Sequence, residues 1–245
     1  GNRRIISVDG EGNNIDGRHA YTLLAAADDR GFRDYIERDG TRRAAESHHR
    51  QPNCGLATEQ CLKFLLSLKQ RHSDLIVSFS FSYDAVKLIS DLTMDQCIEL
   101  AETEKVDHGK YRIEFRPRKW LKISVPSAGK TRMPDGSIGY RKCVTVWDAF
   151  GYFQQSFVNA LFSSKHLFGE EDMTLIKMIA DMKGKRSEFE NESADDVREY
   201  CFQECRLLSV MMRDLLTSVE KLKIYARSFH GSSAIAQRWM KDKGI

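Results

Sequence analysis

Near the start of the sequence, residues 5–12 read IISVDGEG, a short apolar run that ends in two acidic residues, Asp9 and Glu11. Side chains at positions i and i+2 of a β-strand point to the same face of the sheet. Asp9 and Glu11 should therefore lie close together at the end of a strand. Two carboxylates held that close repel each other unless a proton or a metal ion lies between them, so the stretch indicates a cation site on a strand.

The length and composition of the chain limit the kinds of protein that it can be. The chain has 245 residues, of which 41% are hydrophobic, so it can form one large domain with a substantial core. No apolar run approaches the length of a membrane span and no secretion signal is visible, so we expect a protein that is not secreted and contacts no membrane. We also expect it to be intracellular and monomeric. The scattered Cys residues are typical of reduced core cysteines, and a zinc site built from His48, His49 and Cys54 is the weaker alternative.

Hydrophobic periodicity and turn residues predict an α/β chain. Apolar runs predict strands at residues 3–8, 20–28, 74–81 and 140–150, with a tight turn at 11–17. Apolar spacings of three and four predict helices at 57–72, with Thr58 as the N-cap, and at 82–92, 155–164 and 195–221. The order of strand, helix and strand favours a βαβ unit with parallel strands. Polar residues 29–55 fit an insertion or a surface loop.

Residues 109–142 form a basic segment in a chain whose net charge is only +3, because they include ten Lys or Arg residues and two acidic residues. Apolar and basic residues alternate through 111–125, which predicts a β-hairpin with one basic face, and 127–139 consist of turn residues. Such a segment fits a polyanionic partner such as nucleic acid. A solvent-exposed hairpin that happens to be rich in Lys is the alternative.

Three motifs, SVDGEG, FSFSYDAVKL and REYCFQECRLL, resemble in sequence and order the motifs of the 3′–5′ exonuclease domain of family B DNA polymerases. The tyrosine of the third motif is similar to that of the DEDDy branch, and the resemblance is nearest to protein-primed and related viral or plasmid polymerases. VTVWDAFGYFQQSFVNAL is similar to their segment between the second and third motifs, and MKGKR (182–186) to the place of a helper lysine. The resemblance implies an exonuclease domain over residues 1–225 and, at 226–245, the truncated start of a polymerase region.

The resemblance implies an RNase H-like fold, with a mixed central sheet flanked by helices and a basic β-hairpin insertion. It also implies hydrolysis of DNA with two Mg²⁺ or Mn²⁺ ions about 4 Å apart. The implied metal ligands are Asp9, Glu11, Asp84 and Glu204. Tyr200 would orient the attacking water, and Lys183, rather than Lys185, would contact the scissile phosphate. The implied partners are a single-stranded DNA 3′ end and the polymerase domain of the same parent chain, in a viral, plasmid or cytoplasmic replication context.

Nucleic-acid contacts are expected beside Asp84 and on the basic hairpin, where bases can stack on aromatic rings while cations follow the phosphates. The expected residues are Ser80, Phe81, Arg112, Arg116, Arg118, Lys119, Lys122, Lys130 and Arg132. Phe79 could also stack on the terminal bases. Burial of either Phe79 or Phe81 in the hydrophobic core, without contact to bases, is an equally good alternative. Gly10 and Gly12 would leave space for the nucleic-acid end and its metals. Asp148 is read as a structural residue.

Two residues depart from the family pattern. The third motif usually ends in Asp where this chain has Glu204, and the second usually has Asn where this chain has Ser80. These departures leave open a catalytically weakened module of the same fold that binds single strands. A stand-alone RNase of the DEDD superfamily also stays open, because the carboxylates do not read the 2′-hydroxyl group.

Overall fold

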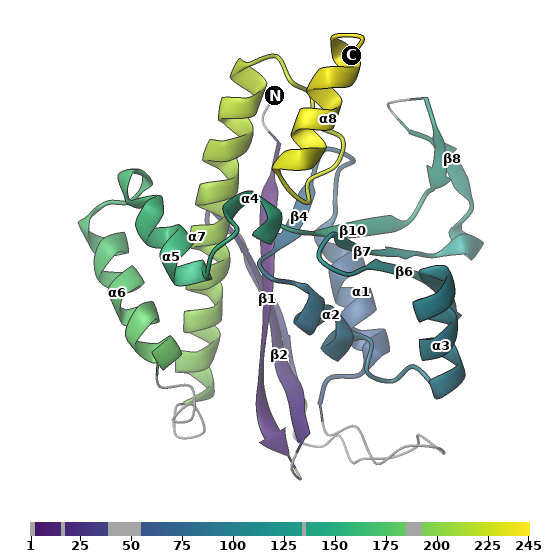
Figure 1. Ribbon diagram of the computed structural model, residues 1–245. Helices are drawn as coiled ribbons and strands as arrows, with labels where there is room; N and C mark the ends of the chain where they lie inside the picture. The colour runs from purple at the N-terminus through teal and green to yellow at the C-terminus, as the bar shows by residue number, and fades with distance from the viewer. Residues whose placement is uncertain (1–2, 16–17, 39–54, 134–135, 185–192) are drawn as a thin grey trace.

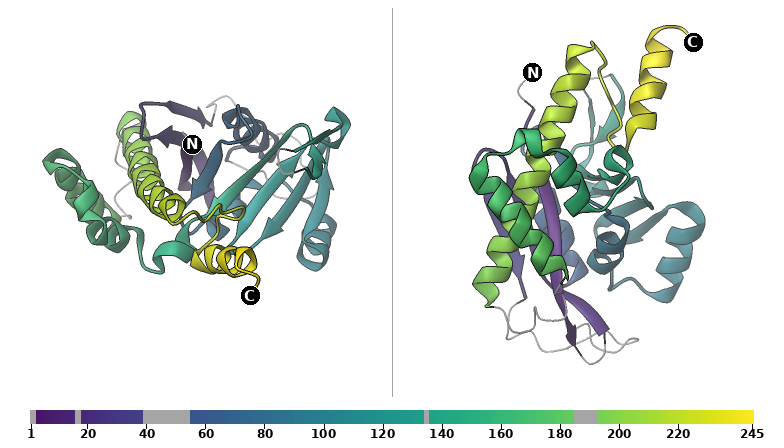
Figure 2. Two further views of the ribbon diagram at one scale, coloured as in Figure 1. Left: turned by 90° about the horizontal axis from the view of Figure 1, so that it is seen from above. Right: turned by 60° about the vertical axis from the view of Figure 1, so that its left-hand side comes forward.

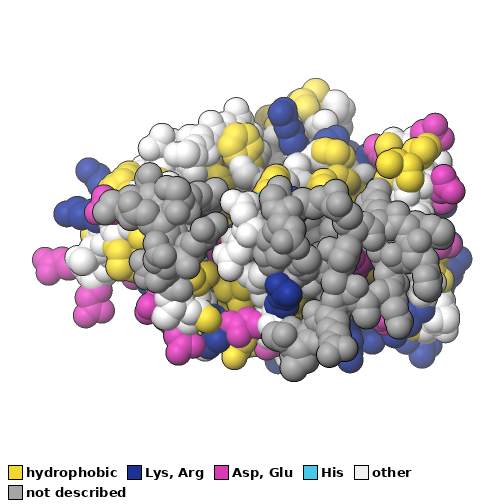
Figure 3. All heavy atoms as spheres, turned by 90° about the horizontal axis from the view of Figure 1, so that it is seen from below, with side chains coloured by type: hydrophobic (Ala, Val, Ile, Leu, Met, Phe, Trp, Pro, Cys, Tyr) yellow, Lys and Arg dark blue, Asp and Glu magenta, His cyan; other side chains and the backbone are white. Residues whose placement is uncertain are grey.

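The computed structural model describes residues 3–15, 18–38, 55–133, 136–184 and 193–245 (Figure 1). The proposed zinc ligands His48, His49 and Cys54, and Lys185, lie outside these residues. In the described part of the chain, no helix has the length and apolar character that crossing a membrane requires. Charged side chains of both signs are spread over the face shown in Figure 3.

A mixed eight-stranded sheet forms the centre of the fold, in the order β3-β2-β1-β4-β10-β7-β6-β5. β4 pairs in parallel with β1 on one side and with β10 on the other, and the remaining neighbours are antiparallel. The expected parallel pairing is thus confirmed. The strands are β1 (Ile5–Ile15), β2 (Arg18–Asp28), β3 (Arg33–Glu37), β4 (Leu75–Ser78), β5 (Lys105–His108), β6 (Tyr111–Arg116), β7 (Trp120–Ser124) and β10 (Cys143–Asp148), with a separate hairpin of β8 (Lys130–Arg132) and β9 (Ile138–Tyr140).

Helices cover both faces of this sheet (Figures 1 and 2). They are α1 (Thr58–Leu68), α2 (Ser82–Leu88), α3 (Met94–Thr103), α4 (Phe150–Phe153), α5 (Phe157–Ser163), α6 (Glu170–Gly184), α7 (Ala194–Lys221) and α8 (Ser232–Asp242), with 3₁₀ turns at Pro126–Ala128 and Lys165–Leu167. α7 packs along β1 and β2, and α6 lies on its outer side. Because alternate residues of a strand face opposite ways, Ile6 and Val8 pack into the core with α1, whereas Ile5 packs with α7.

The first strand is longer than the sequence predicts. β1 does not end at Asp9 and Glu11 but continues to Ile15, where a turn was expected, and its pairing with β2 shifts register between Glu11 and Gly12. Both acidic residues therefore lie inside a strand, beside a bulge. The expected surface loop at 29–55 contains the edge strand β3, and residues 39–54 lie outside the described chain.

The predicted N-cap of α1 is wrong, and the predicted hairpin at 111–125 is not an insertion. The N-cap of α1 is Ala57, because the Thr58 hydroxyl is used elsewhere: it accepts a hydrogen bond from the Asp91 backbone N–H at 3.0 Å. The predicted hairpin at 111–125 does form as β6 and β7, but these strands belong to the central sheet and their apolar side chains, such as Ile113 and Leu121, are buried in the core. The predicted turn segment 127–139 contains the β8–β9 hairpin.

Candidate metal centre

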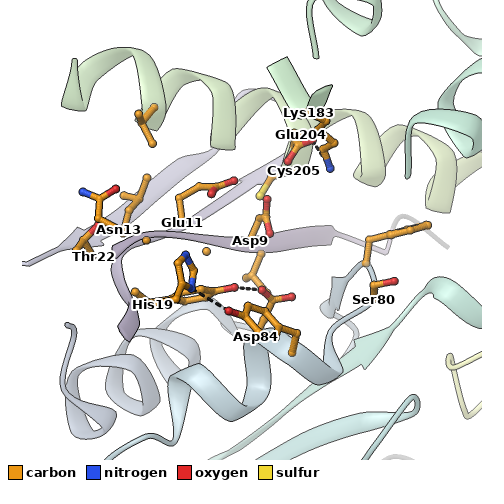
Figure 4. A pocket seen from close by; sticks show the side chains of 18 of the residues that line it. Asp9, Glu11, Asn13, His19, Thr22, Ser80, Asp84, Lys183, Glu204 and Cys205 are labelled. Carbon is orange, nitrogen blue, oxygen red and sulfur yellow. Dashed lines mark hydrogen bonds and ion pairs between the residues drawn. The ribbon is translucent and has the colours of Figure 1, made fainter. Parts of the chain in front are cut away.

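Three carboxylates meet where α7 crosses β1. Asp9 and Glu11 project from β1, Glu204 projects from α7, and one oxygen of each lies within 4.8 Å of the others. Asp9 and Glu11 are half-buried, and Glu204 is only 4% exposed. This cluster, drawn in Figure 4, could hold a metal ion, and it brings together residues far apart in the sequence.

Small polar side chains fix the position of α7 on the sheet. The Ser7 and Ser209 hydroxyl oxygens are 2.8 Å apart, and both residues are buried. The Cys201 thiol donates to the backbone carbonyl of Asp9 at 3.5 Å, and the Cys205 thiol donates to the carbonyl of Ala25 at 3.8 Å. Short side chains let the helix approach the strands closely, which places Glu204 over the acidic face of β1.

Glu204 is held by two neighbours. The Tyr200 hydroxyl, one helical turn earlier, donates to Glu204 Oε1 at 3.0 Å, and Lys183 Nζ lies 2.8 Å from the same oxygen. Lys183 comes from the end of α6, and its ammonium group also lies 4.8 Å from the centre of the Phe157 ring. Burial and the nearby negative charges of Glu204 and Glu11 raise the pKa of Tyr200, so its hydroxyl stays protonated and remains a donor.

Asp84 lines the same pocket from the first turn of α2. Asp84, labelled in Figure 4, is not part of the three-carboxylate cluster, and its Oδ1 accepts a hydrogen bond from the hydroxyl of Tyr21 on β2. The pocket has a volume of about 1190 Å³. The structure therefore brings all four predicted acidic residues to one pocket, with three of them in direct proximity.

The negative charge at this site is concentrated. Burial raises the pKa of Asp9 well above its ordinary value, and the charges of Glu204, Glu11 and Asp84 raise it further. A bound divalent cation would offset this repulsion. The donor set consists of carboxylate oxygens, which suit hard cations such as Mg²⁺ and Mn²⁺.

Asp148 organises the loop that leads to Asp84. It is 2% exposed, its Oδ2 accepts from the Phe81 N–H at 3.0 Å and its Oδ1 accepts from the Phe150 N–H at 3.0 Å. Burial raises the pKa of Asp148, although these N–H groups act in the opposite direction. These contacts agree with the structural role predicted for Asp148.

The backbone turn at Ser80, in the same loop, determines whether Phe79 or Phe81 faces the pocket. Ser80 has a φ of 55°, in the left-handed region, and this turn ends the alternation of β4. Ser80 and Phe79 line the pocket, whereas Phe81 is 2% exposed and packs in the core. The expectation that Phe81 stacks on bases is therefore wrong, because its ring faces are covered by protein.

The predicted basic contacts lie outside the pocket lining. These residues are Arg112, Arg116, Arg118, Lys119, Lys122, Lys130 and Arg132. Three of them already pair with acids: Arg112 with Asp107 at 2.8 Å, Arg116 with Glu104 at 2.5 Å and Lys122 with Glu114 at 2.8 Å. The turn between β6 and β7 lies against α2, since the Arg118 N–H donates to the Ser82 hydroxyl at 2.7 Å.

Sequence reasoning missed the aromatic residues around Asp84. Tyr21, His19 and Tyr83 all line the pocket and contact one another through their rings. Gly10 and Gly12 of β1 were the sequence feature that could have indicated a close neighbour, but they do not leave space for nucleic acid and metals as predicted. A Cβ at Gly10 would overlap the Tyr21 ring, and one at Gly12 would overlap the backbone of the paired strand, so both glycines make room for protein atoms.

The chain shows little similarity to known proteins, in sequence or in structure. The chain matches no protein-family model, and a search of curated proteins finds no match. One similar solved structure is the Phi29 DNA polymerase complexed with primer-template DNA and incoming nucleotide substrates, a ternary complex. The TM-score is 0.47 and the sequence identity 8%, over 99% of this chain and 35% of that chain. The chain thus spans about a third of the length of that polymerase chain.

Proposed function

We propose that the chain is a metal-dependent 3′–5′ exonuclease domain of a family B-type DNA polymerase that hydrolyses single-stranded DNA from its 3′ end. One observation carries the proposal: Asp9, Glu11 and Glu204 form a carboxylate cluster, and the Tyr200 hydroxyl donates to Glu204. The resemblance of the three sequence motifs supports the same assignment of residues. Residues 1–225 would form this domain, and 226–245 would begin a polymerase region.

The carboxylates fit two Mg²⁺ or Mn²⁺ ions, with Asp9, Glu11, Asp84 and Glu204 as ligands. When bound, such ions supply an activated water and stabilise the charge of the leaving 3′ oxygen. Protein side chains would orient the attacking water and contact the phosphate. The protonated Tyr200 hydroxyl, which donates to Glu204, would orient the attacking water, and the Lys183 ammonium, which contacts Glu204, would contact the scissile phosphate.

Two surfaces would hold the DNA strand. Phe79 and Ser80, which line the pocket, would contact the terminal nucleotides. The exposed basic residues Arg118 and Lys119 lie in the turn packed against α2, and would contact phosphates further along the strand. Lys130 and Arg132, on the separate β8–β9 hairpin, would extend this basic surface.

A 5′-labelled single-stranded oligonucleotide tests the proposal. With Mg²⁺ or Mn²⁺, the wild-type chain should produce a ladder of products that shorten from the 3′ end. The double variant Asp9→Ala, Glu11→Ala should abolish the ladder while its circular dichroism stays that of the wild type. Lys177→Met, an exposed change on α6, is the matched control and should digest DNA at the wild-type rate. Equal digestion by the double variant and the wild type would contradict the assignment.

A second candidate function is a single-strand-binding module that no longer cuts. The Lys183–Glu204 ion pair favours it, because this cation already offsets the charge of Glu204. The same assay separates the two candidates, since the module would retard the labelled strand in a gel without shortening it. An RNA oligonucleotide of the same sequence, digested faster than DNA, would instead indicate an RNase.

A further inference from the structure

Tyr21 is a buried tyrosine that lines the pocket from β2, the strand paired with the carboxylate-bearing strand β1. It is 5% exposed, and the pairing of β1 with β2 places it across from Gly12, directly after the register shift. Its ring lies over Gly10, where a Cβ would overlap it. The missing side chain of Gly10 therefore creates the space that Tyr21 fills.

The position of Tyr21 is fixed from several sides. Its backbone carbonyl accepts a hydrogen bond from the Leu56 N–H at 2.7 Å. Its ring makes edge contacts with His19 and Tyr83, at centroid distances of 5.8 Å and 6.5 Å. A ring held by backbone pairing, a glycine and two aromatic neighbours can present its hydroxyl in one defined place.

That hydroxyl donates to Oδ1 of Asp84. Burial raises the pKa of Tyr21 far above its ordinary value, and the charges of Asp84, Asp9 and Glu11 raise it further. Tyr21 therefore keeps its proton and acts as a hydrogen-bond donor. Glu204 also accepts a hydrogen bond from a tyrosine, because the Tyr200 hydroxyl donates to it at 3.0 Å.

We propose that Tyr21 is a positioning residue that orients the Asp84 carboxylate toward the metal centre. The inference rests on the proposed metal-dependent function of this site. The physical need is clear from the charges: repulsion from Asp9 tends to turn Asp84 away, and a donor on the pocket wall offsets that repulsion. Each acidic side chain contributed by a helix, Asp84 on α2 and Glu204 on α7, then has a tyrosine donor.

Titration calorimetry with Mn²⁺ alone tests the role of Tyr21 without any substrate. Tyr21→Phe keeps the ring over Gly10 and removes only the donor, so Mn²⁺ affinity should fall about tenfold or more, as for other groups that orient metal ligands. Tyr225→Phe is the matched control, because this exposed side chain lies outside the pocket lining, and it should bind Mn²⁺ like the wild type. Unchanged Mn²⁺ affinity in Tyr21→Phe would overturn the inference.

A double-variant cycle distinguishes positioning from general support of the fold. If Tyr21 acts through Asp84, Tyr21→Phe should cause no further loss of Mn²⁺ affinity in a chain that carries Asp84→Asn. The same tenfold loss in that background would overturn the inference. Should Tyr21→Phe fail to fold, Asp84→Glu shifts the carboxylate by one methylene from the position that the Tyr21 hydroxyl contacts, and wild-type Mn²⁺ affinity in this variant would also overturn the inference. Absence of Mn²⁺ binding by the wild type would instead remove the metal centre itself.

Discussion

Lys183 Nζ lies 2.8 Å from Glu204 Oε1, so a cation of the protein itself contacts the most buried carboxylate of the site. Lys183 reaches this position from the last turn of α6, whereas Glu204 is in the middle of α7. Only 24% of the Lys183 side chain is exposed, so water screens the pair poorly. The pair holds the Glu204 side chain in place before any metal ion binds.

Lys183→Met should destabilise the metal-free protein. Its loss leaves the buried Glu204 carboxylate without its ammonium partner, at a cost of about 1–3 kcal/mol. For a chain of this length, each kcal/mol lowers the melting temperature by about 2–4 °C. Saturating Mn²⁺ should restore most of the difference, because the divalent ion replaces the lost positive charge. Thermal unfolding with and without Mn²⁺ measures this, with Lys177→Met as the control, and an equal deficit in both conditions would contradict it.

Gly10→Ala should destabilise the protein and disturb the site together. The added Cβ would overlap the Tyr21 ring, and overpacking of this kind costs about 1–3 kcal/mol. Gly169→Ala is the matched control, since no atom lies within 4 Å of the position of its new Cβ. Urea unfolding of both variants checks the prediction. A Gly10→Ala protein as stable as Gly169→Ala would show that Tyr21 can move aside freely.

Much of the fold could be predicted from the spacing of apolar residues, which can be read from the sequence. The alternation in β1 separates residues that pack with α1 from those that pack with α7, and the spacing of α7 indicates the buried face that carries Glu204. The length of β1 was not predictable in this way. Asn13 and Asn14 read as turn residues, yet they remain in the strand because β2 continues to pair with them.

The parts of the site that sequence missed depend on register. Asp9 and Glu11 are two residues apart on one strand, so the sequence alone predicts that they lie close together. The contact between Tyr21 and Asp84 joins two different elements through a shifted strand pair, and no spacing in the sequence encodes that shift. Phe81 was misassigned for a similar reason, because the left-handed turn at Ser80 ends the alternation on which the prediction relied.

Asp28 should make the protein sensitive to acid. Burial alone would raise its pKa, but the N–H groups of Phe32 and Arg30 and the guanidinium group of Arg4 outweigh burial and lower it. The unfolded chain therefore takes up a proton more readily than the folded one. The resulting stability is complete above the ordinary pKa of 3.8 and is lost as the pH falls through the lower folded value.

Asp28→Asn should test this linkage. At pH 7 the variant should lose about 1.5–3 kcal/mol, the usual value of hydrogen bonds to a charged group. As the pH falls below about 4 the difference from the wild type should shrink, because the wild-type carboxylate becomes protonated. Urea unfolding at several pH values gives the measurement, with the exposed Asp181→Asn as the control. A stability difference that stays constant down to pH 2 would contradict the linkage.

Salt dependence should separate the basic residues that contact DNA from those already paired. Arg118→Gln with Lys119→Gln removes two exposed cations beside α2, so the slope of log affinity against log salt for a single strand should decrease by about 1.4. Arg112→Gln with Lys122→Gln removes two cations that pair with Asp107 and Glu114, and should change the slope less. Fluorescence anisotropy in EDTA, which prevents digestion, measures both slopes. Equal changes for the two double variants would show that the ion pairs do not shield their cations from the DNA.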